Sequence, residues 1–222
     1  TWWPLRRGLV RHPLTLRKCD VMLSLPARLE RAQPTAAYYY SSYVFITRRG
    51  RELRIGSLDD PVLPRLRIGL PLSGARPDPA LADALARRGM SSNVAGYDLS
   101  GESATADRPG GLLGAVERGD VDVAIAWGPI AGYFSKRARA GLALQPVLPR
   151  VDRLLPLAYG VAAGVRSGDT TTRRVLEAAF TRHAGEIRQL LLDYGFPLLD
   201  PGPPAGASPS LSAVPALVAS RR

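Results

Sequence analysis

The chain has 222 residues and a mass of 23.8 kDa, enough for one large domain or for two lobes of about 100 residues each. Apolar residues make up 45% of the chain and charged residues 22%, with 22 Gly and 20 Pro, and this composition excludes a fully disordered, fibrous or coiled-coil protein. The formal net charge is +11, but the basic residues are spread in short runs, which favours a solvated basic surface, open to an acidic protein partner, over a nucleic-acid-binding face.

The N-terminal part of the chain predicts a short helix followed by two extended segments. Residues 6–16 fit the helix, residues 19–23 fit a buried strand, and residues 43–48 fit a segment that leads from one lobe to the next. No apolar run reaches the ~20 residues that a membrane helix needs, so we expect no membrane span. Because the sequence starts with Thr1 and not with Met, a signal peptide can precede it.

The middle of the chain alternates between strand-like and helix-like patterns. The expected strands are residues 66–70, 93–97 and 121–127, and the expected helices are residues 78–88 and 111–118, followed by Gly89 and Gly119. Each helix is expected to end at a glycine, and the first begins with an Asp-Pro pair that is typical of a helix start. Such alternation predicts a parallel sheet covered by helices.

The C-terminal part repeats this pattern before its composition changes. Residues 157–165 fit an extended segment, and Asp169 fits the cap of a helix in which apolar residues recur at helical spacing as far as Tyr194, with a break at Gly185. Residues 201–222 are rich in Pro, Gly, Ala and Ser, and we expect them to form a flexible tail.

Few residues of the chain are suited to catalysis or to metal binding. The single cysteine, Cys19, and the two histidines, His12 and His183, have no metal-ligand spacing, and no nucleotide-binding or hydrolase motif occurs. A structural role is favoured for His183, and an inert thiol or half of a disulfide is favoured for Cys19 over a nucleophile. The sequence therefore predicts no catalytic residue, no metal site and no cofactor.

Several strings, in the order in which they occur, resemble the type II periplasmic solute-binding proteins. The strings are Tyr38–Arg48, Ser57–Pro61, Leu66–Gly69, Glu117–Ala124, Tyr159–Asp169 and Asp193–Pro197. The resemblance implies an α/β protein of two lobes, each a mostly parallel sheet flanked by helices. Residues 1–47 plus 159–200 would form lobe one, residues 48–158 would form lobe two, and residues 201–222 would form the tail.

A second set of strings resembles, more narrowly, the periplasmic solute-binding-like proteins associated with quinoprotein methanol dehydrogenase. The strings are Thr1–Pro4, Arg6–Gly8, Cys19–Val21, Tyr39–Phe45 and Ala126–Phe134. The resemblance implies a non-catalytic, exported periplasmic protein that assists the dehydrogenase or its electron-acceptor system. It also implies that the family's first strand and helix would precede Thr1, which leaves lobe one incomplete, and that a cysteine in that strand would pair with Cys19.

The two-lobed fold implies a ligand cleft where strand ends and loops converge. Trp127 stands where the amino-acid binders of the family commonly have a carboxylate, so an ordinary amino acid is disfavoured as the ligand. The cleft would accept a small molecule or a protein segment. The candidate cleft residues are Tyr39, Tyr40, Ser41, Ser42, Trp127, Gly128 and Tyr133.

Three other functions share this architecture. The first alternative is the substrate-binding component of an ABC-type uptake transporter for a small neutral or aromatic solute. An enzyme such as a dehydratase would need an acid or base in the cleft, for which Asp20, Glu30 and Glu102 are the candidates. A transcription-factor effector domain would need a DNA-binding pair of helices upstream.

Overall fold

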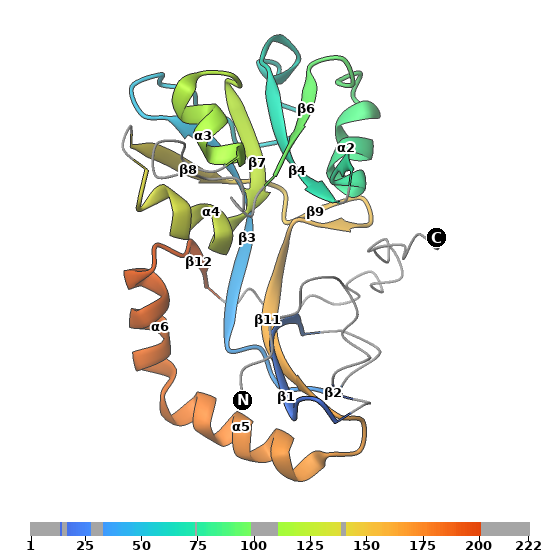
Figure 1. Ribbon diagram of the computed structural model, residues 1–222, viewed down its shortest axis with the longest axis vertical. Coiled ribbons are helices and arrows are strands. Elements are labelled where there is room, and N and C mark those ends of the chain that lie inside the picture. Colours follow the sequence, from blue (N-terminus) through green and yellow to red (C-terminus); the bar gives the residue numbers. More distant parts are fainter. Residues whose placement is uncertain are drawn as a thin grey trace. The chain divides into compact units, whose positions relative to one another are not determined.

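A computed structural model describes residues 14, 17–27, 33–73, 75–98, 111–138 and 141–200 (Figure 1). The expected tail and, apart from Leu14, the expected helix over residues 6–16 lie outside this part of the chain. The chain folds into two compact units. Of the described residues, unit 1 contains 14–41, 159–191 and 198–200, and unit 2 contains 42–158 and 192–197. Residues 42–47 and 192–197, which were expected in lobe one, lie in unit 2, and the lobe boundaries otherwise stay a prediction.

The sheet of unit 2 mixes parallel and antiparallel strands. Strand β4 (Ile68–Ser73) lies parallel to both β6 (Val94–Tyr97) and β7 (Val123–Trp127). Strand β3 (Tyr39–Arg48) pairs antiparallel with β7 on one side and with β8 (Leu142–Pro146) on the other. The three strands expected in the middle of the chain are therefore confirmed, and the parallel part of the sheet lies among them.

Two of the helices of unit 2 begin where the sequence predicts, and α3 also ends there, whereas α2 ends two residues before the expected Arg88. Helix α2 (Pro79–Ala86) is capped by Asp78, whose Oδ1 accepts hydrogen bonds from the backbone N–H groups of Ala80 and Leu81, both at 3.1 Å. Helix α3 (Gly111–Arg118) is followed by Gly119, which has a φ of +81°. A left-handed residue after a helix favours glycine because a side chain would clash there.

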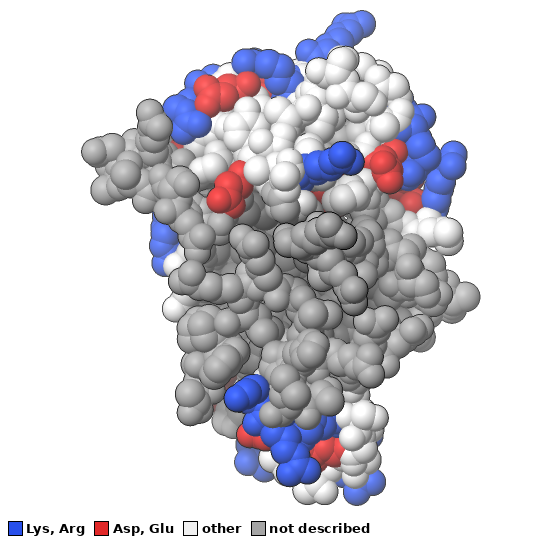
Figure 2. Space-filling view, turned by 45° about the vertical axis from the view of Figure 1, so that its right-hand side comes forward, with Lys and Arg blue, Asp and Glu red and all other residues white. Residues whose placement is uncertain are grey.

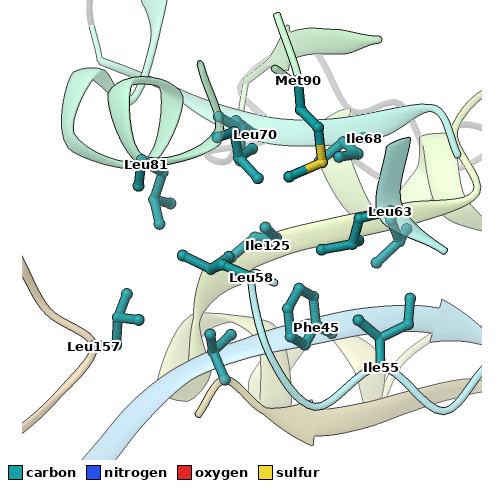
Figure 3. Packing of buried hydrophobic residues seen from close by; sticks show 14 residues of the cluster. Phe45, Ile55, Leu58, Leu63, Ile68, Leu70, Leu81, Met90, Ile125 and Leu157 are labelled. Carbon is teal, nitrogen blue, oxygen red and sulfur yellow. The ribbon is translucent and has the colours of Figure 1, made fainter. Parts of the chain in front are cut away.

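Both faces of the unit 2 sheet are buried because alternate residues of β3 and β7 enter different apolar clusters. Phe45 and Ile125 lie in the first cluster, together with Leu81 and Leu85 of α2 (Figure 3). The second cluster holds neighbouring residues of the same strands and the apolar face of α3. Its members from these three elements are Val44, Ile46, Ala124, Ala126, Leu112, Leu113, Ala115 and Val116.

Short pairing segments complete the secondary structure of unit 2. Strand β5 (Arg76–Pro77) folds back on the end of β4. Strands β9 (Val151–Asp152) and β10 (Leu155–Pro156) form a separate antiparallel hairpin. A short 3₁₀ helix, η1 (Leu63–Arg65), precedes β4.

In the described part of unit 1, β11 and β12 form antiparallel strand pairs. Strand β11 (Ala158–Val165) pairs with β1 (Val21–Pro26) and with β2 (Gln33–Pro34), and β12 (Leu198–Leu199) pairs with the start of β3. The expected α/β fold class is confirmed, but the expectation of a mostly parallel sheet in each lobe is wrong for these residues. The reason is that strands far apart in sequence lie beside β11, and strand spacing along the chain does not reveal their direction.

Two consecutive helices follow β11. Asp169 Oδ1 accepts a hydrogen bond of 3.0 Å from the backbone N–H of Thr172 and so caps α5 (Thr170–Arg182). Helix α6 (Ala184–Asp193) starts after His183, so the break comes two residues before the expected Gly185. His183 is half-exposed, and its Nδ1 lies 3.1 Å from Glu186 Oε1, which fits the structural role expected for it.

A buried carboxylate ties together the starts of β4 and β7. Only 9% of the Asp122 side chain is exposed. It accepts hydrogen bonds from the backbone N–H of Arg67 at 2.9 Å and from the Arg67 Nε at 3.1 Å, and it also pairs with Arg51. These two guanidinium groups and the backbone hydrogen bond hold the pKa of Asp122 well below its usual range, and burial opposes them only in part.

We expect Asp122→Asn to lower the free energy of unfolding by about 1–3 kcal/mol at pH 7, because the charge-assisted hydrogen bonds are lost. The lowered pKa makes this contribution complete above the unfolded-state pKa of ~3.9 and removes it as the pH falls through the folded-state pKa. Urea titrations of both proteins from pH 7 to pH 2 should therefore converge at the acid end.

Asp120→Asn is the matched control, because Asp120 forms an exposed pair with Arg118 two residues away. Such surface pairs contribute roughly 0–1 kcal/mol. A gap between the parent and Asp122→Asn that stays constant down to pH 2, or a cost of Asp120→Asn as large as that of Asp122→Asn, would contradict the assignment.

Candidate functional site

The seven candidate cleft residues divide between the two units. Tyr39, Tyr40 and Ser41 lie in unit 1, at the start of β3. The remaining four lie in unit 2, at the next residue of β3, at the end of β7 and on α4 (Gly128–Ser135). Each group lies within one unit, and a cleft common to both groups stays a prediction.

The tyrosines of unit 1 form an aromatic packing layer. Tyr39 is buried, and its ring meets the edge of Tyr38 with a centroid distance of 5.1 Å. Tyr38 in turn lies 4.7 Å from the ring of Phe180 on α5. Burial raises the pKa of both hydroxyls, although hydrogen bonding to Ser24 opposes this rise. Tyr40 lies against Gly160 of β11, where a Cβ would come within 2.9 Å of the ring.

Two consecutive serines carry buried hydroxyl groups in β3. Ser41 and Ser42 are exposed by only 0% and 1%. Within the residues that the structure describes, the Ser42 Oγ has no hydrogen-bond partner. A buried hydroxyl without a partner is costly, by roughly 1–3 kcal/mol, and a ligand or an ordered water would satisfy it. Of the candidate residues, Ser42 therefore has the clearest capacity to bind a polar group.

An aromatic pair closes the end of β7 in unit 2. Tyr43 and Trp127 are directly opposite each other in the register of β3 and β7, and their rings meet edge to face at 5.5 Å. Burial, together with the nearby carboxylate of Asp78, raises the pKa of Tyr43. The hydroxyl is thus held neutral, and the pair combines apolar ring surface with two polar groups, the Tyr43 hydroxyl and the Trp127 indole N–H.

Helix α4 begins immediately after Trp127, at Gly128, and the sequence analysis did not predict it. The available signal was Pro129, which occupies the first turn, where a missing backbone N–H carries no cost. The helix was not expected because it contains two glycines, Gly128 and Gly132, and glycine is a weak helix former.

Tyr133 packs against the C-terminal segment 192–197 of the same unit. Its ring stacks on that of Tyr194 with a centroid distance of 6.1 Å and an interplanar angle of 10°. The Arg137 guanidinium lies 3.8 Å from the centre of the Tyr133 ring, in a cation–π contact. Lys136 Nζ donates a hydrogen bond to the carbonyl of Asp193. Tyr133 therefore helps to hold this segment on α4.

The backbones of α4 and the C-terminal segment approach too closely for a side chain between them. A Cβ added to Gly132 would overlap the carbonyl group of Gly195 and lie 3.2 Å from Pro197 Cδ. Gly195 itself has a φ of +82°, which favours glycine. Position 132 thus accepts only glycine if Tyr194 is to reach Tyr133.

The other residues considered at the sequence level gain no catalytic setting. Asp20 is exposed and pairs with Arg166 at 2.9 Å, while Glu30 and Glu102 lie outside the described residues. Cys19 is half-buried, and burial raises the pKa of its thiol, which lowers its nucleophilicity at neutral pH. Its pairing with a second cysteine stays a prediction.

Two further kinds of site have no candidate among the described residues. Over residues 17–27, 33–73, 75–98, 111–138 and 141–200, no group of three or more His, Cys, Asp or Glu side chains could hold a metal ion. None of the helices described in those ranges is both long enough and apolar enough to cross a bilayer.

Comparison with known proteins identifies two curated relatives with the same name. Protein MoxJ of Methylorubrum extorquens is 27% identical over 199 residues, which cover 86% of this chain and 66% of the relative. Protein MoxJ of Paracoccus denitrificans is 23% identical over 202 residues, which cover 86% of this chain and 72% of the relative. The chain therefore spans about two thirds of the length of these proteins. No family model matches it.

Solved structures show the same fold. MxaJ from Methlophaga aminisulfidivorans MPT has a TM-score of 0.68 at 20% identity, and the periplasmic binding protein XoxJ from Methylobacterium extorquens AM1 has a TM-score of 0.63 at 24% identity. Both matches cover 84% of this chain and 78% of the other. An ancestral arginine-binding protein matches with a TM-score of 0.51 at 18% identity, over 84% of this chain and 76% of the other.

These comparisons confirm the resemblance that the sequence strings indicate. The chain has the fold of a periplasmic binding protein, and it is similar in sequence to two curated MoxJ proteins.

We expect Gly132→Ala to destabilise the protein by roughly 1–3 kcal/mol, because the added methyl group displaces the segment that carries Tyr194. Gly185→Ala is the control. It lies in α6 with no atom within 4 Å of the point that an added methyl group would occupy, and alanine should stabilise that helix by about 0.5–1 kcal/mol. Thermal unfolding followed by circular dichroism measures both changes. Equal midpoints for the two variants would contradict the close approach.

Proposed function

We propose that this homologue of the MoxJ proteins is a periplasmic accessory protein of a quinoprotein methanol dehydrogenase system, and that it binds its partner without catalysing a reaction. The observation that carries the proposal is the similarity to two MoxJ proteins over 86% of the chain. The structural match to MxaJ and XoxJ supports it at the level of the fold.

The residues available for chemistry support a binding role over a catalytic one. His183 lies at an exposed helix end beside Glu186. Asp122 and Asp152 are buried, but each is held by arginines in pairs that connect structural elements. A general acid or base must be free to exchange a proton with a substrate, and carboxylates held as anions by arginine do this poorly.

The charge of the chain supports a partner with an acidic face. The net charge is +11, and several of the described acidic side chains are already paired with arginine. Figure 2 shows Lys and Arg side chains at many points of the described surface, with Asp and Glu among them. Such a surface accelerates encounter with an acidic protein and makes the association sensitive to salt.

The second candidate function is solute binding for an ABC-type uptake transporter. The specific observation in its favour is the Tyr43–Trp127 pair, since it provides aromatic surface and the last residue of β7 is a tryptophan and not a carboxylate. A neutral or aromatic solute would suit it better than an amino acid, whose ammonium group needs a negative partner. The MoxJ relationship favours the accessory role over this alternative.

The test is a binding measurement between the purified chain and methanol dehydrogenase from the same organism. At 20 mM NaCl we expect a complex, and at 500 mM NaCl we expect the affinity to fall by about tenfold or more, because the screening length falls from about 20 Å to about 4 Å. Biolayer interferometry gives both dissociation constants. Serum albumin, an unrelated acidic protein, serves as the control for general charge attraction.

Two results would contradict the proposal. The first is an absence of binding to the dehydrogenase at both salt concentrations. The second is binding to albumin with the same affinity. A thermal shift above about 5 °C with a small neutral or aromatic solute, in the absence of dehydrogenase binding, would instead support the transporter role.

A further inference from the structure

The β9–β10 hairpin exposes apolar side chains although its base is buried. Val147 and Leu157, which flank it, have 0% exposure and belong to the first apolar cluster of unit 2. Between them, Leu148, Val151 and Leu154 are exposed by 51%, 37% and 65%. Single exposed leucines are common on protein surfaces, but here three apolar residues are exposed within seven positions, at the hairpin and just before it.

The hairpin is held in place by a buried ion pair. Asp152 of β9 accepts hydrogen bonds from both terminal nitrogens of Arg88, at 2.9 and 2.8 Å, and Arg87 lies 3.7 Å away. Arg88 follows α2 and also binds Asp59 at 2.7 Å. A bidentate arginine with little exposure fixes the geometry of the carboxylate that it holds. The ion pair therefore anchors the hairpin to the end of α2; Figure 1 labels its first strand, β9.

The turn of the hairpin carries an unfavourable residue. Strand pairing of Leu155 with Asp152 leaves Arg153 and Leu154 as the two turn residues. Arg153 has a φ of +56°, in the left-handed region where a hairpin turn favours Gly, Asn or Asp. A strained side chain retained at a turn suggests that the side chain itself is needed. Arg153 directly precedes Leu154, which is the most exposed leucine among the described residues.

Two exposed guanidinium groups border the apolar residues. Arg150 and Arg153 are exposed, and neither has an ion-pair partner among the described residues. Arginine beside apolar side chains is the composition that protein interfaces favour. A second copy of this chain would bring two molecules of charge +11 together, with like charges beside each other. An acidic protein surface with an apolar recess fits these residues better.

We propose that the hairpin tip, defined as residues 148–154, is a docking surface for an acidic protein partner, with Leu154 inserted into an apolar recess and Arg150 and Arg153 facing carboxylates. The identity of the partner rests on the proposed function, which makes it the methanol dehydrogenase. The docking surface lies in unit 2 and uses none of the seven candidate cleft residues.

The first experiment compares binding of the parent chain, Leu154→Ser and Leu190→Ser to the purified dehydrogenase. Leu190 on α6 is 57% exposed and provides a matched control. Leu154→Ser should weaken binding by about tenfold or more, the loss typical of a central interface residue, and Leu190→Ser by less than about twofold. Thermal midpoints of the three proteins should agree, because both leucines are exposed.

A second pair of variants tests the charges. Arg153→Glu should weaken binding and reduce its dependence on salt, whereas Arg174→Glu, which changes an exposed arginine of α5, should leave both nearly unchanged. Arg153→Gly should raise the thermal midpoint by removing the unfavourable φ while still weakening binding. Opposite effects on stability and on binding are not expected from a residue with a purely structural role.

The outcomes separate this proposal from the proposed function. If the parent chain binds and Leu154→Ser binds equally well, the docking surface is wrong and the accessory role stands. If Arg174→Glu weakens binding as much as Arg153→Glu, the attraction is general and the docking surface is wrong. If the parent chain does not bind the dehydrogenase, the accessory role is overturned, and with it the assignment of this surface.

Discussion

The double-sided burial of β3 and β7 is the constraint on which unit 2 depends. Phe45 enters one apolar cluster, whereas its neighbours Val44 and Ile46 enter the other, and α2 and α3 cover opposite faces. A strand buried on both sides has no position for a functional polar side chain along most of its length. Apart from Ser42 in β3, binding groups are therefore expected at strand ends and in connecting segments. Trp127, at the end of β7, and the β9–β10 hairpin both lie in such places.

Local signals predicted the elements whose boundaries depend on nearby residues. Asp78 and Asp169 cap α2 and α5 as expected, because a carboxylate cap acts within three residues. The direction of the strands around β11 was not predictable, since it depends on pairing between distant parts of the chain. Helix α4 was missed because packing against residues 192–197 stabilises a segment with weak helical propensity.

The sequence indicated which types of residue to consider for the candidate site. It did not indicate how their side chains are arranged in space. Tyr39 and Ser42 were selected as aromatic and hydroxyl side chains at an expected crossover, and their place in a cleft stays a prediction. Their environments depend on contacts that sequence spacing does not encode, such as Phe180 near Tyr38. The stacking of Tyr133 on Tyr194 likewise joins distant segments. The hairpin tip gave no sequence signal, because exposed and buried leucines look alike until the fold separates them.

The contact between Gly132 and Gly195 has an evolutionary consequence. Where one backbone rests on another, a mutation at either position cannot be absorbed by repacking a side chain, because there is none. Substitutions at these two sites are therefore restricted together. A homologue that loses either glycine needs a different packing of residues 192–197 against α4. Across diverging homologues, this pair should change more slowly than the tyrosines that it brings together.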